Sequence, residues 1–160
     1  MDNRHFARAK IKWAVSINTD DCSADGVTLN LSPNGAYIGC ANPLRLNEVF
    51  EVTIDVPDTD SSIQATAEVV FSNIYGPDDA ISPRGMGVRF VKISSQSRRI
   101  IAKEILQHLR SDNEKIDSRK LQRLETLIID PNGKDWGVHL SSFMEPVEFR
   151  LRFFSVSGKR

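Results

Sequence analysis

Residues 27–38 read VTLNLSPNGAYI, and this stretch decides the fold. Residues 27–31 alternate apolar and polar side chains, and a second strand-like run resumes at residues 36–38. Between them stand Pro33, Asn34 and Gly35. Asn-Gly between two strand-like runs is the strongest short-range signal for a β-hairpin. The stretch therefore predicts two antiparallel strands joined by a tight turn.

Four further runs on both sides of this hairpin have the same strand-like pattern. They are residues 11–17 (IKWAVSI), 49–56 (VFEVTIDV), 63–74 (IQATAEVVFSNI) and 86–93 (MGVRFVKI). Strands at short spacing with turn residues between them indicate a small antiparallel barrel. Closure also removes the exposed strand edges that would otherwise pair with other chains. We expect a mainly β fold, a small antiparallel β-barrel.

The pattern changes to a helical one after Ser94 and Ser95. Ile101, Ile105 and Leu109 recur on one helical face, so we expect a helix that closes one end of the barrel. Residues 111–116 read as a linker and residues 116–129 as a second helix. The latter uses an apolar face of Ile116, Leu121, Leu124 and Ile128.

Residues 147–153 (VEFRLRF) alternate cleanly and predict one half-buried strand without a partner that the sequence identifies. We divide the chain into a barrel domain over residues 1–110, with a flexible N-terminal arginine segment, and an α/β C-terminal extension over residues 111–160. The role of the extension, including a possible homodimer interface, is open.

The composition excludes several classes of function. The chain has 160 residues, with 21 Lys+Arg against 21 Asp+Glu, so a surface that coats nucleic acid is not expected. Neither a signal peptide nor a membrane span is evident, and Cys22 and Cys40 form no CxxC pair. We expect a cytoplasmic protein with free thiols. No catalytic or metal-ligand motif is found, so we expect no enzyme, no catalytic residue, no metal and no cofactor.

The N-terminus carries a local cluster of positive charge. Residues 1–13 contain four basic residues, Arg4, Arg8, Lys10 and Lys12, and only one acidic residue, Asp2. Arg4 and Arg8 form an RxxxR motif. Arginine pairs bidentately with phosphate or with the edge of guanine, and its plane stacks on bases. An RxxxR match also arises by chance, as in residues 119–123, where i,i+4 spacing on a helix merely gives a solvated face.

The hairpin turn itself, NLSPNG over residues 30–35, is a second candidate site. Asn30 and Ser32 are two positions apart on a strand, so their side chains share one face and could read the polar edge of a base. Gly35 permits positive φ and a close approach of a ligand to the backbone. The alternative is a plain turn in which Asn30 and Ser32 make local hydrogen bonds.

A second stretch, DCSADG over residues 21–26, fits the same pattern of Asp or Asn, Ser and Gly. It falls wholly within a cluster of turn-forming residues between two predicted strands, whereas NLSPNG begins on a strand and ends in an Asn-Gly turn, which fixes its polar pair on one face. We assign DCSADG to a hairpin loop and NLSPNG to the site.

RHFAR over residues 4–8, followed by NLSPNG, resembles the two-part signature of PilZ domains, RxxxR and then [D/N]xSxxG. Residues 85–106 (GMGVRFVKISSQSRRIIAKEIL) resemble the last barrel strand and closing helix of that family. Asn30 follows Arg8 by 22 positions, which is within the spacing of the family, whereas DCSADG begins only 13 positions after Arg8, too soon for it. The resemblance implies a six-stranded antiparallel PilZ-like barrel that binds cyclic di-GMP. Arg4 and Arg8 would hold phosphate and guanine, Asn30 and Ser32 would contact a guanine, and Gly35 would permit the loop geometry.

Three functions follow as hypotheses. The first is a cyclic di-GMP receptor that orders its RxxxR segment onto the barrel and signals through a protein partner. The second is an adaptor of the same fold that binds proteins and no nucleotide. The third, a binder of single-stranded nucleic acid, needs a long basic groove with stacking aromatic residues, and the zero net charge argues against it. We therefore expect no DNA or RNA partner and no membrane insertion.

Overall fold

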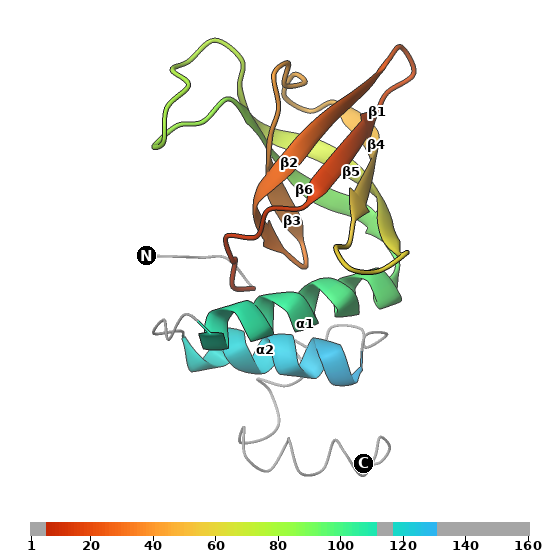
Figure 1. The fold of residues 1–160 in the computed structure, drawn as a ribbon, viewed down its shortest axis with the longest axis vertical. Coiled ribbons are helices and arrows are strands. Elements are labelled where there is room, and N and C mark those ends of the chain that lie inside the picture. The colour runs from red at the N-terminus through yellow and green to blue at the C-terminus, as the bar shows by residue number, and fades with distance from the viewer. Residues whose placement is uncertain (1–5, 112–116, 131–160) are drawn as a thin grey trace.

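The computed structural model describes residues 6–111 and 117–130. Six strands precede two helices along the chain (Figure 1). The strands are β1 (Ala14–Asn18), β2 (Ser23–Ser32), β3 (Gly35–Gly39), β4 (Val49–Asp55), β5 (Ser62–Asn73) and β6 (Gly85–Ile93). The helices are α1 (Ser95–Ser111) and α2 (Ser118–Ile129).

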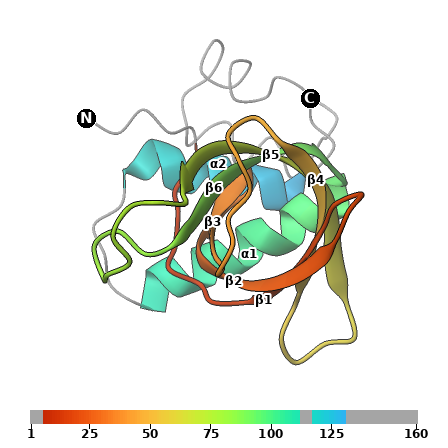
Figure 2. The same ribbon diagram turned by 90° about the horizontal axis from the view of Figure 1, so that it is seen from above.

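The strands form a closed barrel in the order β1-β2-β3-β6-β5-β4, and every pairing is antiparallel. Viewed from above, the strands enclose one interior (Figure 2). The alternating residues of the sequence fill it, for example Val15 and Ile17 from β1 and Val52 and Ile54 from β4. The predicted six-stranded barrel is confirmed.

Helix α1 closes the lower end of the barrel, and α2 packs on α1 from below (Figure 1). Ile101, Ile105 and Leu109 are buried as the helical pattern predicts. Helix α2 begins at Ser118 instead of the expected residue 116, because the Asp117 carboxylate caps it by accepting a hydrogen bond from Arg119 N at 2.9 Å.

The apolar face of α2 also differs slightly from expectation. Leu124 is buried as predicted, Leu127 is buried beside it, and Leu121 and Ile128 are half-buried. The strand expected over residues 147–153 lies outside the described residues. Neither described helix is long and apolar enough to cross a membrane.

The N-terminal segment is fastened to the barrel before the first strand begins. The side chains of Phe6, Ala7, Ala9, Ile11 and Trp13 are buried in the core. Its backbone pairs with β2 through the Ala9–Leu31 bridge and through Trp13, whose carbonyl accepts from Thr28 N at 2.9 Å. The strand expected from residue 11 therefore begins only at Ala14, and residues 6–13 pack on the barrel ahead of it.

The polar hairpin between β1 and β2 corrects the assignment of DCSADG to a loop. Only residues 19–22 form the turn, closed by a hydrogen bond from Thr19 N to Cys22 O, and Ser23 already pairs with Asn18. Residues 23–25 are exposed on a strand. Residues 23–25 pair with β1 but lie beyond the residues of β2 that pair with β3, so this end of β2 is at the rim of the barrel, where polar side chains reach water.

A β-bulge interrupts β2 between Thr28 and Asn30. It breaks the simple alternation of the sequence, so that the polar Thr28 is buried and Leu29 is only half-buried. The buried hydroxyl of Thr28 is satisfied, because it donates to Ile11 O at 2.6 Å and accepts from Trp13 N at 2.8 Å. Leu29 thereby turns to the outer wall of the barrel.

The turn between β2 and β3 corrects the expected reason for Gly35. No glycine among the described residues has positive φ. Gly35 is instead required by close packing, because a Cβ there would lie 2.2 Å from the carbonyl oxygen of Val88 on β6. The missing side chain admits a neighbouring strand to the backbone.

We predict that Gly35→Ala lowers the free energy of unfolding by about 1–3 kcal/mol, the usual cost of overpacking. Gly87→Ala is the matched control, because a Cβ at Gly87 would lie 3.5 Å from its nearest neighbour, an ordinary contact. Urea unfolding followed by circular dichroism measures both. Equal stability of the two variants would contradict the packing role of Gly35.

We also predict different reactivities for the two thiols. Burial raises the pKa of Cys40, whereas Cys22 is exposed. A raised pKa lowers the thiolate fraction at any pH below it, and thiolate is the reactive form. Iodoacetamide at pH 7.5 should therefore alkylate Cys22 first in the folded protein, as mass spectrometry would detect. Faster labelling of Cys40 would contradict this.

Candidate functional site

The structure brings the N-terminal arginine segment and the NLSPNG turn together. Ala9 and Leu31 exchange backbone hydrogen bonds of 3.1 and 2.9 Å. In an antiparallel pair this register places Arg8 opposite Ser32 and Lys10 opposite Asn30. Arg8 is exposed beside the turn, while Arg4, the other predicted arginine, lies outside the described residues.

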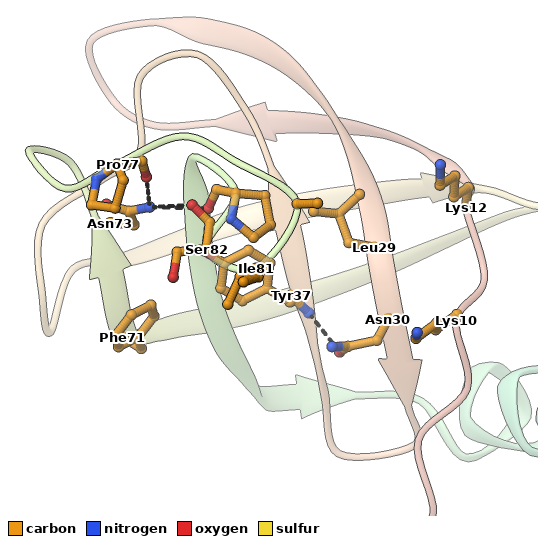
Figure 3. A pocket seen from close by; sticks show the side chains of 12 residues that line it. Lys10, Lys12, Leu29, Asn30, Tyr37, Phe71, Asn73, Pro77, Ile81 and Ser82 are labelled. Atoms are coloured by element: carbon orange, nitrogen blue, oxygen red, sulfur yellow. Dashed lines mark hydrogen bonds between the residues drawn. The ribbon is translucent and has the colours of Figure 1, made fainter.

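Asn30 is half-buried and holds the start of the hairpin. Its Oδ1 atom accepts a hydrogen bond from Tyr37 N at 3.2 Å, drawn as a dashed line in Figure 3. Asn30 and Tyr37 are register partners just beyond the β-bulge. The carbonyl oxygen of the amide is thus engaged across the hairpin, and the Nδ2 group remains a donor for a ligand.

Ser32 is only 4% exposed and organises the turn. Its Oγ atom accepts from Asn34 N and Gly35 N, both at 3.2 Å, and its proton is placed to reach Gly35 O at 3.3 Å. Ser32 therefore makes the local hydrogen bonds that the sequence analysis gave as the alternative to contact with a ligand. The sequence prediction that Ser32 also contacts a ligand stays a prediction.

Arg98 on α1 is a member of this region that sequence reasoning missed. Its Nη2 atom donates to Asn34 Oδ1 at 3.1 Å, and its guanidinium lies 5.7 Å from the centre of the Phe6 ring. Burial lowers the pKa of Arg98 below its usual value. Asn34 belongs to the turn and Phe6 to the RxxxR segment, so Arg98 ties both to the closing helix. No sequence motif indicates this contact.

A pocket of about 790 Å³ opens beside the site on the outer wall of the barrel (Figure 3). Asn30 lines it together with two lysines, two aromatic residues and the loop that follows β5. The lining residues are Lys10, Lys12, Leu29, Asn30, Tyr37, Phe71, Asn73, Pro77, Ala80, Ile81, Ser82 and Pro83. Sequence reasoning missed it because the loop and Phe71 carry no motif.

The site has the chemistry of anion and base recognition. The exposed side chains of Arg8, Lys10 and Lys12 supply positive charge, and Asn30 supplies an amide. Among residues 6–111 and 117–130 no group of three or more His, Cys, Asp or Glu side chains could hold a metal ion.

Solved structures share the fold. Over 72% of this chain, the Bacillus subtilis inhibitor of motility (MotI/DgrA) matches with a TM-score of 0.59 and 18% identity. The PilZ domain of Escherichia coli YcgR, solved with c-di-GMP, matches over 70% of this chain with a TM-score of 0.53 and 15% identity. This chain covers 95% of that domain, but only 54% of the motility inhibitor.

No curated protein is significantly similar to the sequence. The sequence itself, however, matches the PilZ domain family over residues 2–107, well over half of the chain. The match includes both the RxxxR segment and the NLSPNG turn, and the closed antiparallel barrel agrees with it. The chain therefore belongs to the PilZ domain family.

Proposed function

We propose that this protein is a non-enzymatic receptor for cyclic di-GMP that signals through a protein partner. The observation that carries the proposal is the Ala9–Leu31 bridge, which seats Arg8 beside the turn of residues 30–35 in a chain of this family. The PilZ domain of YcgR, whose fold resembles this one, was solved with c-di-GMP, which supports the choice of ligand.

The chemistry of the ligand suits the groups at the site. Cyclic di-GMP offers two phosphates and two guanines, and an arginine pairs bidentately with either. We assign Arg4 and Arg8 to these contacts and Asn30 to a guanine edge, with Gly35 and Ser32 shaping the turn. Ser32 would contact the ligand only if its hydroxyl exchanged a local hydrogen bond for a bond to the base.

The signal would pass from the ligand to the closing helix. Phe6 stands between Arg4 and Arg8 in sequence, and its ring faces the guanidinium of Arg98. Asn34 in the turn binds the same guanidinium. A ligand that moved either one would alter the contacts at the first turn of α1, and α1 packs on α2. A cytoplasmic location and a homodimer through residues 111–160 stay predictions.

An adaptor that binds proteins and no nucleotide is the second candidate. Large apolar side chains are exposed on the loop between β5 and β6, namely Tyr75 at 90% and Ile81 at 93%. Exposed apolar side chains that gather in one region mark interaction surfaces. This observation favours a protein partner for the receptor and for the adaptor alike. The two hypotheses therefore differ only in whether the chain binds cyclic di-GMP.

We predict that calorimetry detects binding of cyclic di-GMP to the wild-type chain and that Arg8→Ala weakens it at least tenfold. The lost charge-assisted hydrogen bonds are worth about 1.5–3 kcal/mol, and 1.4 kcal/mol is a factor of ten. Arg45→Ala is the matched control, since Arg45 is exposed on a loop away from the turn.

Each result of this titration decides between the candidates. No heat and no thermal shift with the wild-type chain would refute the receptor and leave the adaptor. Binding that Arg8→Ala and Arg45→Ala weaken equally would show that the site lies elsewhere.

Hydrogen exchange tests the ordering of the arginine segment. We expect cyclic di-GMP to slow exchange most at residues 2–8. The amides of Ala9 and Leu31 should already be protected without ligand, because they are hydrogen-bonded to each other's carbonyl groups. Mass spectrometry of peptides covering residues 2–13 and 27–38 gives the measurement. Unchanged exchange at residues 2–8 on ligand addition would contradict the ordering step.

A further inference from the structure

The loop over residues 74–84, between β5 and β6, carries the two most exposed large apolar side chains among residues 6–111 and 117–130. Tyr75 is 90% exposed and Ile81 is 93% exposed, whereas the next most exposed, Val49 on β4, is at 60%. Single apolar side chains scattered over a surface are ordinary, but two that are almost fully exposed on one short loop mark an interaction surface. The loop therefore presents apolar surface that the fold itself does not use.

Hydrogen bonds from one buried side chain hold the loop in shape. Asn73 lies at the end of β5, and its Nδ2 atom donates to three carbonyl oxygens of the loop (Figure 3). The acceptors are Pro77 O, Ser82 O and Pro83 O, at 2.8, 3.1 and 3.1 Å. Gly76 packs on the same side chain, because a Cβ there would lie 2.5 Å from Asn73 Oδ1. Asn73 thus ties the two arms of the loop to each other.

The charged side chains of the loop complete this framework. The Oδ1 atom of Asp79 accepts from Ser82 N, and the Oδ1 atom of Asp78 accepts from Arg84 N, both at 2.8 Å. The guanidinium of Arg84 donates to Ile74 O at the other end of the loop. Because its two arms are joined in this way, the loop is preorganised, and a partner that binds it has little ordering to impose.

The exposed charge of the loop is negative. Asp78 and Asp79 are exposed, and neither has an ion-pair partner within the described part of the chain. Each uses Oδ1 for the backbone of the loop, which leaves Oδ2 as an acceptor for a partner. The cation of the loop, Arg84, is half-buried and bound to the backbone. Two carboxylates therefore accompany Tyr75 and Ile81 at the surface.

The surroundings of the loop extend this negative charge. The loop projects from the end of the barrel opposite to α1 and α2, as does the hairpin between β1 and β2 (Figure 1). That hairpin exposes Asp20, Asp21 and Asp25, whereas α1 at the other end exposes Lys103 and Arg110. An acidic end repels anionic lipid surfaces and nucleic acid, and it attracts a basic protein surface.

We propose that the loop over residues 74–84 is the docking element for a protein partner that presents an apolar pocket edged by Lys or Arg side chains. Tyr75 and Ile81 fill the pocket, and Asp78 and Asp79 pair with its basic edge. Tyrosine is enriched among the few residues that dominate the binding energy of interfaces. The inference rests on the protein partner of the proposed function, and it holds for the receptor and the adaptor alike because it requires no ligand.

Selection of peptides from a random displayed library on the full chain, without cyclic di-GMP, tests the loop. We expect enriched peptides that combine aromatic or aliphatic residues with Lys or Arg. Fluorescence anisotropy then gives their affinities for Tyr75→Ser/Ile81→Ser and for the matched control Val49→Ser/Val91→Ser, whose exposed valines lie on β4 and β6. The loop variant should bind at least about tenfold more weakly than the control, as truncation of interface hot spots does. Equal affinities, or no enriched peptide of this kind, would overturn the proposal.

Asp78→Asn and Asp79→Asn test the charge of the loop separately from its shape. Asparagine keeps a carbonyl oxygen that can accept from the same backbone N–H groups. Both variants should weaken peptide binding at low salt and make it less salt-dependent, because they remove a charge pair. Asp60→Asn, on the loop between β4 and β5, is the control and should change neither. A salt dependence that all three variants leave unchanged would overturn the basic edge of the partner.

Sedimentation of the wild-type chain separates such a partner from a second copy of the chain. A monomer, or a dimer that Tyr75→Ser/Ile81→Ser leaves intact, keeps the loop free and supports the proposal. A dimer that the same variant dissociates would assign the loop to a second copy and overturn it. None of these measurements uses cyclic di-GMP, so a failed titration would refute the receptor and leave the docking loop, and a failed selection would do the reverse.

Discussion

The backbone pair between Ala9 and Leu31 is the contact on which the candidate site depends. It holds the N-terminal segment to β2 outside the regular ladder, so the register of one bridge decides which side chains face each other. Because Ala9 and Leu31 point into the core, Arg8 and Lys10 are left outside, opposite Ser32 and Asn30. Shifting this pairing by one residue would bury the cations and expose the apolar residues of the segment.

The site is joined to the helices by a side chain rather than by the backbone. Arg98 contacts the turn through Asn34 and the N-terminal segment through Phe6, and the three residues come from three separate parts of the chain. Helix α1 carries Arg98 near its first turn and packs against α2 through its apolar face. A rearrangement of Asn34 or Phe6 would therefore change the contacts of Arg98 and, through α1, could reach α2. Coupling between distant sites requires such a continuous chain of contacts.

Periodicity was enough to predict the barrel and the closing helix, because burial on one face imposes a two-residue repeat on strands and a 3.6-residue repeat on helices. Periodicity did not predict that residues 23–25 belong to a strand, because their side chains are exposed and polar. It also did not predict the burial of Thr28, because a β-bulge shifts the alternation there. The contact of Asn34 with Arg98 spans 64 residues, and the pocket depends on the bulge beside Phe71. Neither leaves a local signal in the sequence.

The NLSPNG motif has a structural requirement that is independent of any ligand. Gly35 is needed because β6 passes 2.2 Å from where its Cβ would be, and the Ser32 hydroxyl satisfies two backbone N–H groups of the turn. A PilZ barrel that had lost its ligand would still need both residues to close this corner. An intact NLSPNG motif thus indicates the turn and is not by itself evidence of a ligand; the positive charges beside it are carried by the exposed residues Arg8, Lys10 and Lys12 of the N-terminal segment.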